Sequence, residues 1–343
     1  MIKYLSKKAQ VLISYVAGLQ PQDVGWVKLN TNENPYPPSP KVAQALQNMD
    51  ISRLRLYPDS DSRQLCEAIA QNLGIGSEKV FVGNSSDEVL ALAFQTFLTG
   101  KILAQPDISY GFYPVWSQMY DANIKSVPVR EDFSIAVEDY QNEQAVIIAN
   151  PNAPTSLAIN DVEQLVKNNE FVIIDEAYID FANFSGAISL TKKYDNLLVV
   201  RTFSKSYSLA GMRVGFAVGN EKLIEGLNKV KHAFNSYPVD MLAQAVATAA
   251  IQDRTYLRQT CNRIIATRNR TTDKLSELGY NVLNSQANFL FVTNVDAKDL
   301  YEYLFSNKIL VRYWGQPRIK ECLRITIGTD KEMEAFIQCV GQK

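Results

Sequence analysis

Four short apolar runs in this sequence each lead into side chains that can do chemistry. One leads to Lys205, an amine that can form a Schiff base once partial burial lowers its pKa. Another ends at Asp175, where a carboxylate beside buried residues is costly unless a cation pairs with it. A third leads into Ser86 and Asp87, at the start of a helical pattern whose free N–H groups suit a phosphate. The fourth leads into residues 150–155. Each cluster alone also fits a helix cap, a salt bridge or a surface lysine, so the prediction of a site rests on their joint placement.

The elements that must position these side chains follow from the apolar pattern between residues 60 and 235. Short continuous apolar runs separated by helical patterns predict buried parallel strands with helices between them. The expected strands are 80–82, 102–104, 145–149, 171–174, 197–200 and 214–218. Ligands of such a sheet bind outside the carboxyl ends of its strands, so the four clusters are expected to meet there.

The chain is expected to have three parts. Residues 1–40 are irregular and rich in Pro and Asn, which predicts an extended arm that packs on the small domain and the active site. Residues 41–235 are predicted to form a large α/β domain, a three-layer fold with a mostly parallel sheet. Residues 236–343 mix helical patterns with short strands and predict a smaller α+β domain.

Composition excludes several kinds of chemistry. The 343 residues contain 35 Lys and Arg, 36 Asp and Glu, and one His, with a net charge of −1. This near-balance argues against a broad nucleic-acid or membrane surface and favours small-molecule partners. The single histidine, His232, excludes a three-His zinc site and an H-E-x-x-H protease. A Lys, a Tyr or a cofactor is therefore expected to supply the acid–base chemistry, and His232 is expected to be structural or on the surface.

The cysteines and the N-terminus indicate the compartment. The four cysteines are widely spaced and form no C-x-x-C pair, which favours reduced thiols over a disulfide framework or a zinc cluster. The first ten residues lack the apolar stretch of a secretory signal, and no run approaches ~18 continuous apolar residues. We therefore expect a cytoplasmic protein without a membrane span or a bound metal.

Two motifs carry a resemblance to a known family. Residues 204–215 read S-K-S-Y-S-L-A-G-M-R-V-G, and residues 175–178 read D-E-A-Y. Both resemble the signatures of the aminotransferases of fold type I, which depend on pyridoxal phosphate. The arm at residues 30–37, the stretch R-L-Y-P at 55–58 and C-L-R-I-T-I-G-T at 322–329 most resemble the histidinol-phosphate aminotransferase branch.

The resemblance implies pyridoxal phosphate as cofactor and assigns roles around it. Lys205 would form the Schiff base with the cofactor and move the proton, Asp175 would pair with the ring nitrogen, and Tyr178 would hydrogen-bond the ring oxygen. The remaining cofactor-binding residues would stack on the ring or hold the phosphate, and they are Ser86, Asp87, Tyr110, Asn152, Ser204, Arg213 and Tyr57.

The resemblance also implies substrates and a partner. Arg324 would bind the phosphate of histidinol phosphate and the carboxylate of 2-oxoglutarate in turn, with help from Arg312. Tyr15 and Asn32 of the arm would close over the substrate. Tyr57 would reach the phosphate in the neighbouring subunit, which implies a homodimer. The products would be imidazole-acetol phosphate and L-glutamate, in histidine biosynthesis.

The sequence departs from the family pattern N-P-x-N-P-T-G at residues 150–156, which read N-P-N-A-P-T-S. Ala153 stands where the pattern has an Asn that donates to the ring oxygen, so we expect Asn152 to take over through a shifted turn. Ser156 replaces the usual Gly, so a turn with positive φ is less comfortable there.

Three other interpretations stay open. An aromatic-amino-acid aminotransferase and a phosphothreonine decarboxylase of the cobalamin pathway share this scaffold. The third is a cofactor-sensing module of the kind fused to transcription regulators. That module would need a DNA-binding segment, and an arm of about 40 residues is too short and too rich in Pro for a helix-turn-helix.

Overall fold

The computed structural model describes residues 4–343, and its largest element is a seven-stranded sheet. The strands lie in the order β2-β8-β7-β6-β5-β3-β4, with β8 antiparallel to both neighbours and the other neighbouring pairs parallel. Their bounds are β2 (Val80–Asn84), β3 (Ile102–Pro106), β4 (Asn123–Val127), β5 (Ala145–Ala149), β6 (Val172–Asp175), β7 (Leu197–Thr202) and β8 (Val214–Val218). The predicted mostly parallel sheet is confirmed.

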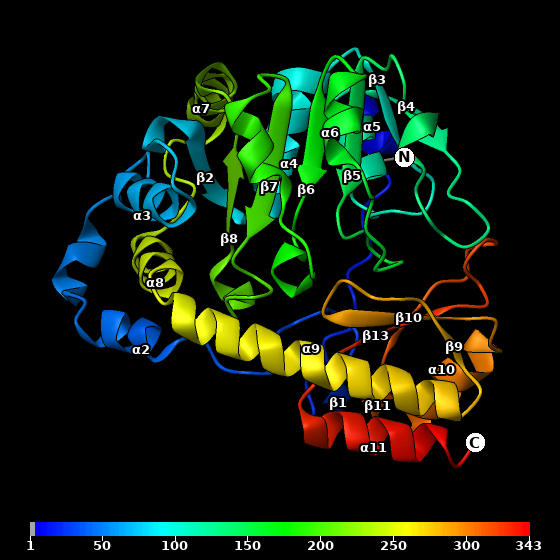
Figure 1. Cartoon of the computed structure of the whole chain (residues 1–343). Coiled ribbons are helices and arrows are strands. Elements are labelled where there is room, and N and C mark those ends of the chain that lie inside the picture. The colour runs from blue at the N-terminus through cyan, green and yellow to red at the C-terminus, as the bar shows by residue number, and fades with distance from the viewer. Residues whose placement is uncertain (1–3) are drawn as a thin grey trace.

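Helices cover both faces of this sheet, which gives the predicted three layers (Figure 1). Alternate residues of each strand face opposite layers: Ile147 packs on one side and Ile148 on the other. Against one face pack α2 (Pro40–Gln47), α3 (Arg63–Leu73), α6 (Val162–Lys167) and α8 (Met241–Ile251). Against the other face pack α4 (Ser85–Ala93), α5 (Tyr113–Met119) and α7 (Glu221–Phe234). Because both faces are covered, these strands are apolar throughout, as their sequences predict.

A smaller antiparallel sheet lies below the large one, in the order β12-β13-β10-β9. Its strands are β9 (Asn281–Val282), β10 (Phe289–Thr293), β12 (Arg312–Tyr313) and β13 (Leu323–Thr326). The helices of this part are α9 (Arg254–Glu277), α10 (Ala297–Ser306) and α11 (Asp330–Val340), and α9 runs obliquely across the molecule with α11 packed against it (Figure 1). The domain boundaries at 40 and 235 stay predictions, and α8, beyond the second of them, packs against α2 and α3.

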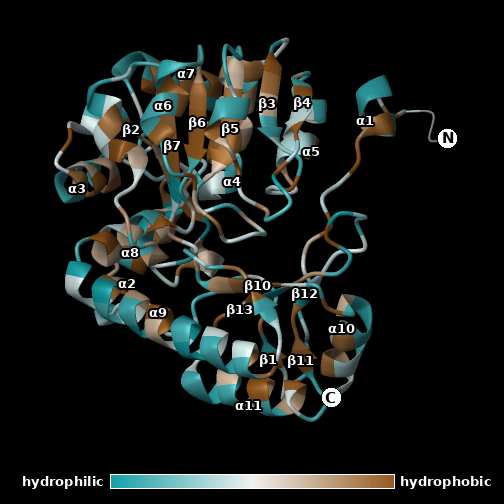
Figure 2. Cartoon of the chain, turned by 45° about the vertical axis from the view of Figure 1, so that its right-hand side comes forward, coloured by the Kyte–Doolittle hydropathy of each residue, from teal (hydrophilic) through white to brown (hydrophobic). Residues whose placement is uncertain are grey.

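The N-terminal arm connects the two parts (Figure 2). Its first helix, α1 (Lys7–Val11), lies beside the end of α5, where Lys8 Nζ donates to Met119 O at 2.9 Å. Farther along, β1 (Val27–Lys28) pairs in parallel with β11 (Ile309–Leu310) of the small domain. The segment between these two contacts passes over the cavity described below, so the arm is placed to line it.

Within residues 4–343, no helix is both long and apolar enough to cross a membrane. All four cysteines are free, and Cys66, Cys261 and Cys322 are buried. His232 lies on α7, half-exposed, with its Nε2 3.1 Å from Asp61 Oδ1. A surface position for His232 is what the sequence predicted.

Candidate active site

A cavity of about 550 Å³ lies where the carboxyl ends of the central strands face the small domain and the arm. All but two of the residues that the sequence predicted for the site line it. They come from six separate parts of the chain, and they are Tyr15, Asn32, Ser86, Asp87, Tyr110, Asp175, Tyr178, Ser204, Lys205, Arg213, Arg312 and Arg324. The four polar clusters therefore meet as the topology of an α/β sheet requires.

Asp175 is the last residue of β6 and its side chain is buried. Tyr113 Oη donates to its Oδ2 at 2.9 Å, and the Ala177 backbone N–H donates to its Oδ1 at 3.1 Å. Burial raises the pKa of Asp175 to about 6, although these two hydrogen bonds favour the charged form. A buried carboxylate with two neutral donors and a raised pKa is suited to a cationic group in the cavity.

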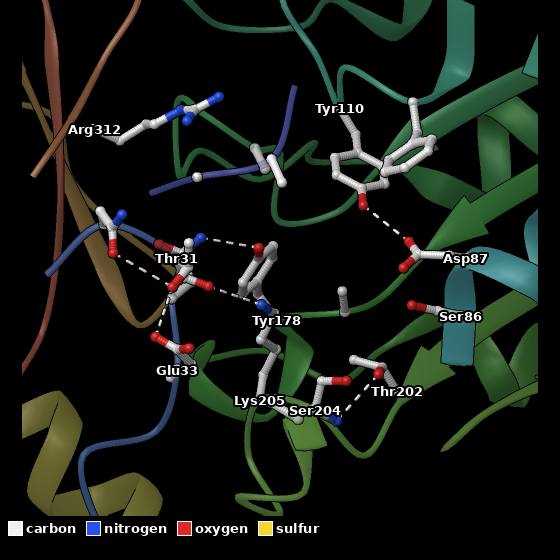
Figure 3. Close-up of a pocket in the computed structure, with 18 of the residues that line it drawn as sticks. Thr31, Glu33, Ser86, Asp87, Tyr110, Tyr178, Thr202, Ser204, Lys205 and Arg312 are labelled. Carbon is white, nitrogen blue, oxygen red and sulfur yellow. Dashed lines mark hydrogen bonds between the residues drawn. The ribbon is translucent and has the colours of Figure 1, made fainter. Parts of the chain in front are cut away.

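Lys205 lies three residues beyond β7, and its Nζ points into the cavity, where it donates to Thr31 O at 3.1 Å (Figure 3). Burial and the positive charge of Arg324 lower the pKa of Lys205 to about 8, against the opposing effect of Glu33. About a fifth of this amine is therefore neutral near physiological pH, far more than of an ordinary lysine, and the neutral amine is the nucleophile and proton acceptor.

We expect the cofactor-free protein to attach pyridoxal phosphate at Lys205 with a rate that reaches half its maximum near pH 8. Only the neutral amine attacks an aldehyde, and the pKa of this lysine falls from 10.5 to about 8. At pH 8 its neutral fraction is about 100-fold larger than that of an ordinary lysine. Stopped-flow absorbance across pH 6–10, with Nα-acetyl-lysine as reference, measures this profile. A midpoint above about pH 9.5 would contradict the lowered pKa.

One end of the cavity carries groups that are suited to a phosphate. Ser86 lies in the first turn of α4, whose N–H groups face this end, and Ser204 adds a hydroxyl. Arg213 has a φ of 51°, and its guanidinium donates to Asp87 Oδ2 at 2.9 Å. Asp87 Oδ1 accepts from Tyr110 Oη, also at 2.9 Å, so one carboxylate orients a guanidinium and an aromatic ring (Figure 3). A guanidinium, hydroxyls and helix N–H groups form a phosphate site.

The close approach of α4 to the sheet at this end requires a glycine. A Cβ on Gly215 of β8 would overlap the backbone nitrogen of Ser86. The last glycine of the motif at residues 204–215 therefore lets the start of α4 lie against the strand. Without it the N–H groups of α4 could not reach their place at the cavity.

The opposite wall comes from the arm and the small domain. Arg324 of β13 donates to Asn30 O at 2.7 Å, while its Nε is buried without a protein partner. Burial lowers the pKa of Arg324. Its guanidinium and that of Arg312 lie 5.3 and 5.4 Å from the ring of Trp314, within reach of a cation–π interaction. Two guanidiniums and an unused buried donor make this wall ready for an anion.

Asn152 does not reach the cavity, so the prediction that it donates to the cofactor ring is wrong. It is fully buried, its Oδ1 accepts from Ser109 Oγ at 3.0 Å, and its Nδ2 donates to Ile108 O and Thr155 Oγ1 at 2.9 and 3.1 Å. These bonds tie the loop at residues 150–156 to residues 108 and 109. Ala153 lines the cavity instead. Ser156 has the positive φ expected of a glycine, 65°, and its buried Oγ has no partner.

Tyr57 is the other predicted residue that does not line this cavity. It is 79% exposed and its ring stacks on Tyr237 with centroids 4.6 Å apart. Because Tyr57 points outward from the single chain, its contact with a partner chain in a dimer stays a prediction.

Sequence reasoning missed several residues that hold the site together. Tyr113 supports Asp175, Trp314 lies beside the two arginines, and Thr31 accepts from Lys205. Glu33 accepts from Thr31 Oγ1 at 2.6 Å and forms an ion pair with Lys28. Burial opposes ionisation of Glu33, but hydrogen bonds from Lys28 and Thr31 leave its pKa below the usual value. The only sequence signal for these residues is that Thr31 and Glu33 stand inside the motif of the arm.

The cavity fits pyridoxal phosphate group by group. The buried carboxylate of Asp175 suits a pyridinium, the Arg213 end suits a phosphate, and the Lys205 amine between them suits an aldehyde. Together with the three-layer fold, this arrangement defines a pyridoxal-phosphate-dependent enzyme of fold type I. The model of the family described as aminotransferase class I and II matches residues 24–340, and the chain belongs to that family, in the branch of the histidinol-phosphate aminotransferases.

The sequence similarity to known relatives extends along nearly the whole chain. The histidinol-phosphate aminotransferase of Brachyspira hyodysenteriae is 48% identical and the alignment covers 98% of both proteins. That of Clostridium botulinum is 46% identical over 98% of this chain and 97% of its own. Among solved structures, the histidinol-phosphate aminotransferase of Sinorhizobium meliloti in complex with pyridoxal-5'-phosphate has a TM-score of 0.86 at 22% identity, covering 100% of this chain and 98% of that one. At that identity the structure supports the fold alone.

Proposed function

We propose that this aminotransferase transfers the amino group of L-histidinol phosphate to 2-oxoglutarate, giving imidazole-acetol phosphate and L-glutamate in histidine biosynthesis. The observation that carries the proposal is Arg324, which lines the cavity and whose buried Nε has no hydrogen-bond partner among residues 4–343. An unpaired buried donor on a cation calls for an anion of the substrate. The names of the relatives, at 46–48% identity, support the choice of substrate.

The residues of the cofactor end divide the work. Arg213, Ser204 and the start of α4 at Ser86 hold the phosphate, with Asp87 orienting Arg213. Asp175 would keep the ring nitrogen of the cofactor protonated, Tyr178 would donate to the ring oxygen, and Tyr110 would pack against the ring. When bound, the cofactor supplies an aldehyde and a ring that withdraws electrons from the substrate carbon.

Lys205 is the proton carrier of the reaction. Its neutral Nζ takes the proton from the substrate carbon that bears the amino group. The ammonium so formed has an acceptor in place, Thr31 O at 3.1 Å. Glu33, whose negative charge favours the protonated form of Lys205, stabilises this state.

The substrate end must accept two different anions in turn. Arg324 binds the phosphate of histidinol phosphate and then a carboxylate of 2-oxoglutarate, with Arg312 beside it. Arg312 also donates to Val16 O of the arm at 3.2 Å. Tyr15, stacked on Phe112 at 4.1 Å, then closes the cavity against water.

The aromatic wall of Tyr15, Phe112 and Trp314 would also suit an aromatic amino acid, so the two substrates must be compared directly. We expect histidinol phosphate to bleach the visible absorption of the cofactor-loaded enzyme at about 100-fold lower concentration than phenylalanine, because a phosphate carries more negative charge toward Arg324 and Arg312 than the single carboxylate of phenylalanine. Preference for phenylalanine would indicate an aromatic aminotransferase. Release of carbon dioxide without an acceptor would indicate a decarboxylase.

We further propose a homodimer in which Tyr57 contacts the phosphate held by the partner chain. Its support is the exposed apolar side chains beside it in the sequence, Ile51, Leu54 and Leu56, together with the exposed Tyr237 stacked on its ring. Such a surface favours burial against another protein.

Hybrid dimers test this contact. We expect Tyr57→Phe to weaken cofactor binding by about 10-fold, the effect of losing one hydrogen bond to a charged group. Mixed with a Lys205→Ala chain at limiting cofactor, random hybrids should regain about a quarter of full activity, because one site of each hybrid has neither change. If Tyr57 served its own chain, every site of the hybrid would be defective and mixing would restore nothing.

The compartment is also a proposal. Four free cysteines, three of them buried, favour a reducing environment. We therefore propose that the enzyme acts in the cytoplasm.

A further inference from the structure

Asn32 of the arm does not lie open to the substrate as the sequence suggested. It is 1% exposed, and its polar groups are engaged by three other residues. Its Nδ2 donates to Tyr178 Oη at 2.9 Å, and its Oδ1 accepts from Thr326 Oγ1 at 3.0 Å (Figure 3 shows the contact with Tyr178). Its backbone oxygen accepts from Asn288 Nδ2 at 3.0 Å. A side chain held in this way is placed to orient a neighbour.

The Thr326 hydroxyl fixes which way the Asn32 amide faces. It accepts from the Asn32 backbone N–H at 2.9 Å, and its own proton is therefore free to go to Asn32 Oδ1. The NH₂ group of Asn32 is left facing Tyr178. The donor at that contact is Asn32 and the acceptor is the tyrosine oxygen.

This direction decides what Tyr178 can do. A hydroxyl that accepts one hydrogen bond still has its proton to give, and accepting a bond makes it a stronger donor. Its ring is held by an edge-on contact with Phe289 at 5.0 Å. The proton of Tyr178 is thus left for an acceptor in the cavity.

Residues 152 and 153 add no second side-chain donor. Ala153 lines the cavity without a polar side chain, and the Asn152 amide already donates to Ile108 O and Thr155 Oγ1. Tyr178 then has to supply the hydrogen bond to the cofactor ring oxygen through a side chain whose direction comes from Asn32.

We propose that Asn32 is a positioning residue for Tyr178, part of a relay Thr326–Asn32–Tyr178 that holds a hydrogen-bond donor toward the cofactor ring oxygen. This inference rests on the proposed function, because it takes Tyr178 as the donor to that oxygen. It assigns Asn32 to the cofactor rather than to the substrate. The arm and β13 of the small domain would then also influence the pH at which the bound cofactor loses its proton.

The test is a double-mutant cycle read in the pH titration of the bound cofactor's visible absorption. When the bound cofactor loses its proton, its ring oxygen carries more negative charge, and a hydrogen-bond donor to that oxygen stabilises this deprotonated form. Loss of the donor therefore raises the pH at the midpoint of the titration. Tyr178→Phe should raise it by about 1 unit, equivalent to about 1.4 kcal/mol. Asn32→Ala should raise it by about half as much, because the tyrosine keeps its proton but loses its orientation.

The decisive comparison is the double variant. If Asn32 acts through Tyr178, Asn32→Ala adds no shift in the Tyr178→Phe background. Additive shifts would overturn the relay, as would an unshifted Asn32→Ala that binds the cofactor normally. Asn169→Ala is the matched control, a buried asparagine away from the cavity that donates to Tyr140 O and Leu165 O, and its midpoint should stay at that of the unaltered enzyme. Melting temperatures verify that every variant is folded.

The same titration separates this inference from the proposed function. If the unaltered protein develops no visible band with pyridoxal phosphate, the proposed function and the relay both fail. If the band forms and histidinol phosphate bleaches it, but the cycle is additive, only the relay fails. Thr326→Val is a third variant that tests the relay, since loss of its hydroxyl should shift the titration midpoint in the same direction as Asn32→Ala.

Discussion

Lys205→Ala is expected to lower kcat by about 10⁴-fold or more, the upper end of what a single acid–base group contributes. Nζ of Lys205 has two tasks, attachment to the cofactor aldehyde and transfer of the substrate proton, and alanine can do neither. Its lowered pKa of about 8 prepares it for both. The measurement is the single-turnover rate with histidinol phosphate, together with mass spectrometry after borohydride reduction, which should find the cofactor mass on Lys205 in the unaltered enzyme and no such adduct in the variant.

Two controls make this result specific. Lys298→Ala removes an exposed lysine on α10 and should leave the rate unchanged. Small primary amines should partly restore Lys205→Ala, because the space left by the side chain admits an external base. A variant that kept a rate within about 10-fold of normal, or that still showed a borohydride-fixed adduct at the equivalent peptide, would refute the assignment of Lys205.

The part of the site that the sequence predicts is the part that local rules govern. Asp175 and Lys205 each follow an apolar strand, and parallel strands bring their carboxyl ends to one edge. Ser86 begins a helix directly after such a strand. Once the strands are recognised, the positions of these residues follow from topology, and no knowledge of distant contacts is needed.

The rest depends on contacts between segments far apart in the sequence. Asn32 meets Thr326 and Tyr178 only because β1 of the arm pairs with β11 of the small domain. Thr31 accepts from Lys205 for the same reason. A sequence pattern carries no record of such pairings, and so the hydrogen bonds of Asn32 could not be predicted from it.

The prediction for Asn152 is wrong for a different reason, which is local to its loop. In the turn at residues 150–156, the backbone N–H of Asn152 donates to Leu157 O and that of Ser156 to Asn152 O, both at 2.7 Å. This closes the loop on itself and turns the Asn152 side chain to Ile108 and Thr155. The identity of a side chain in a tight loop does not tell which way it faces, because one change of backbone angle reverses it.

Arg324→Gln is expected to lower kcat/KM about 10³-fold for histidinol phosphate and for 2-oxoglutarate alike. The guanidinium is buried, and removing one partner of a buried charge pair costs about 3–5 kcal/mol. Equal losses for both substrates follow if one group serves both anions in turn. Arg312→Gln should cost about 10-fold, because Arg312 is only half-buried and a partly exposed ion pair contributes little.

Histidinol without its phosphate distinguishes a substrate contact from general damage to the site. It offers Arg324 no anion, so its slow reaction should be the same in the unaltered enzyme and in Arg324→Gln, and the preference for the phosphorylated donor should fall to about one. A loss shared equally by histidinol would mean that the variant has disturbed the cofactor instead. A second readout follows from charge: because Arg324 lowers the pKa of Lys205, its replacement should move the half-maximal pH of cofactor attachment above the value of about 8. Loss of the phosphate preference together with this upward shift would place Arg324 beside both the substrate anion and the lysine, whereas either one alone would separate the two roles.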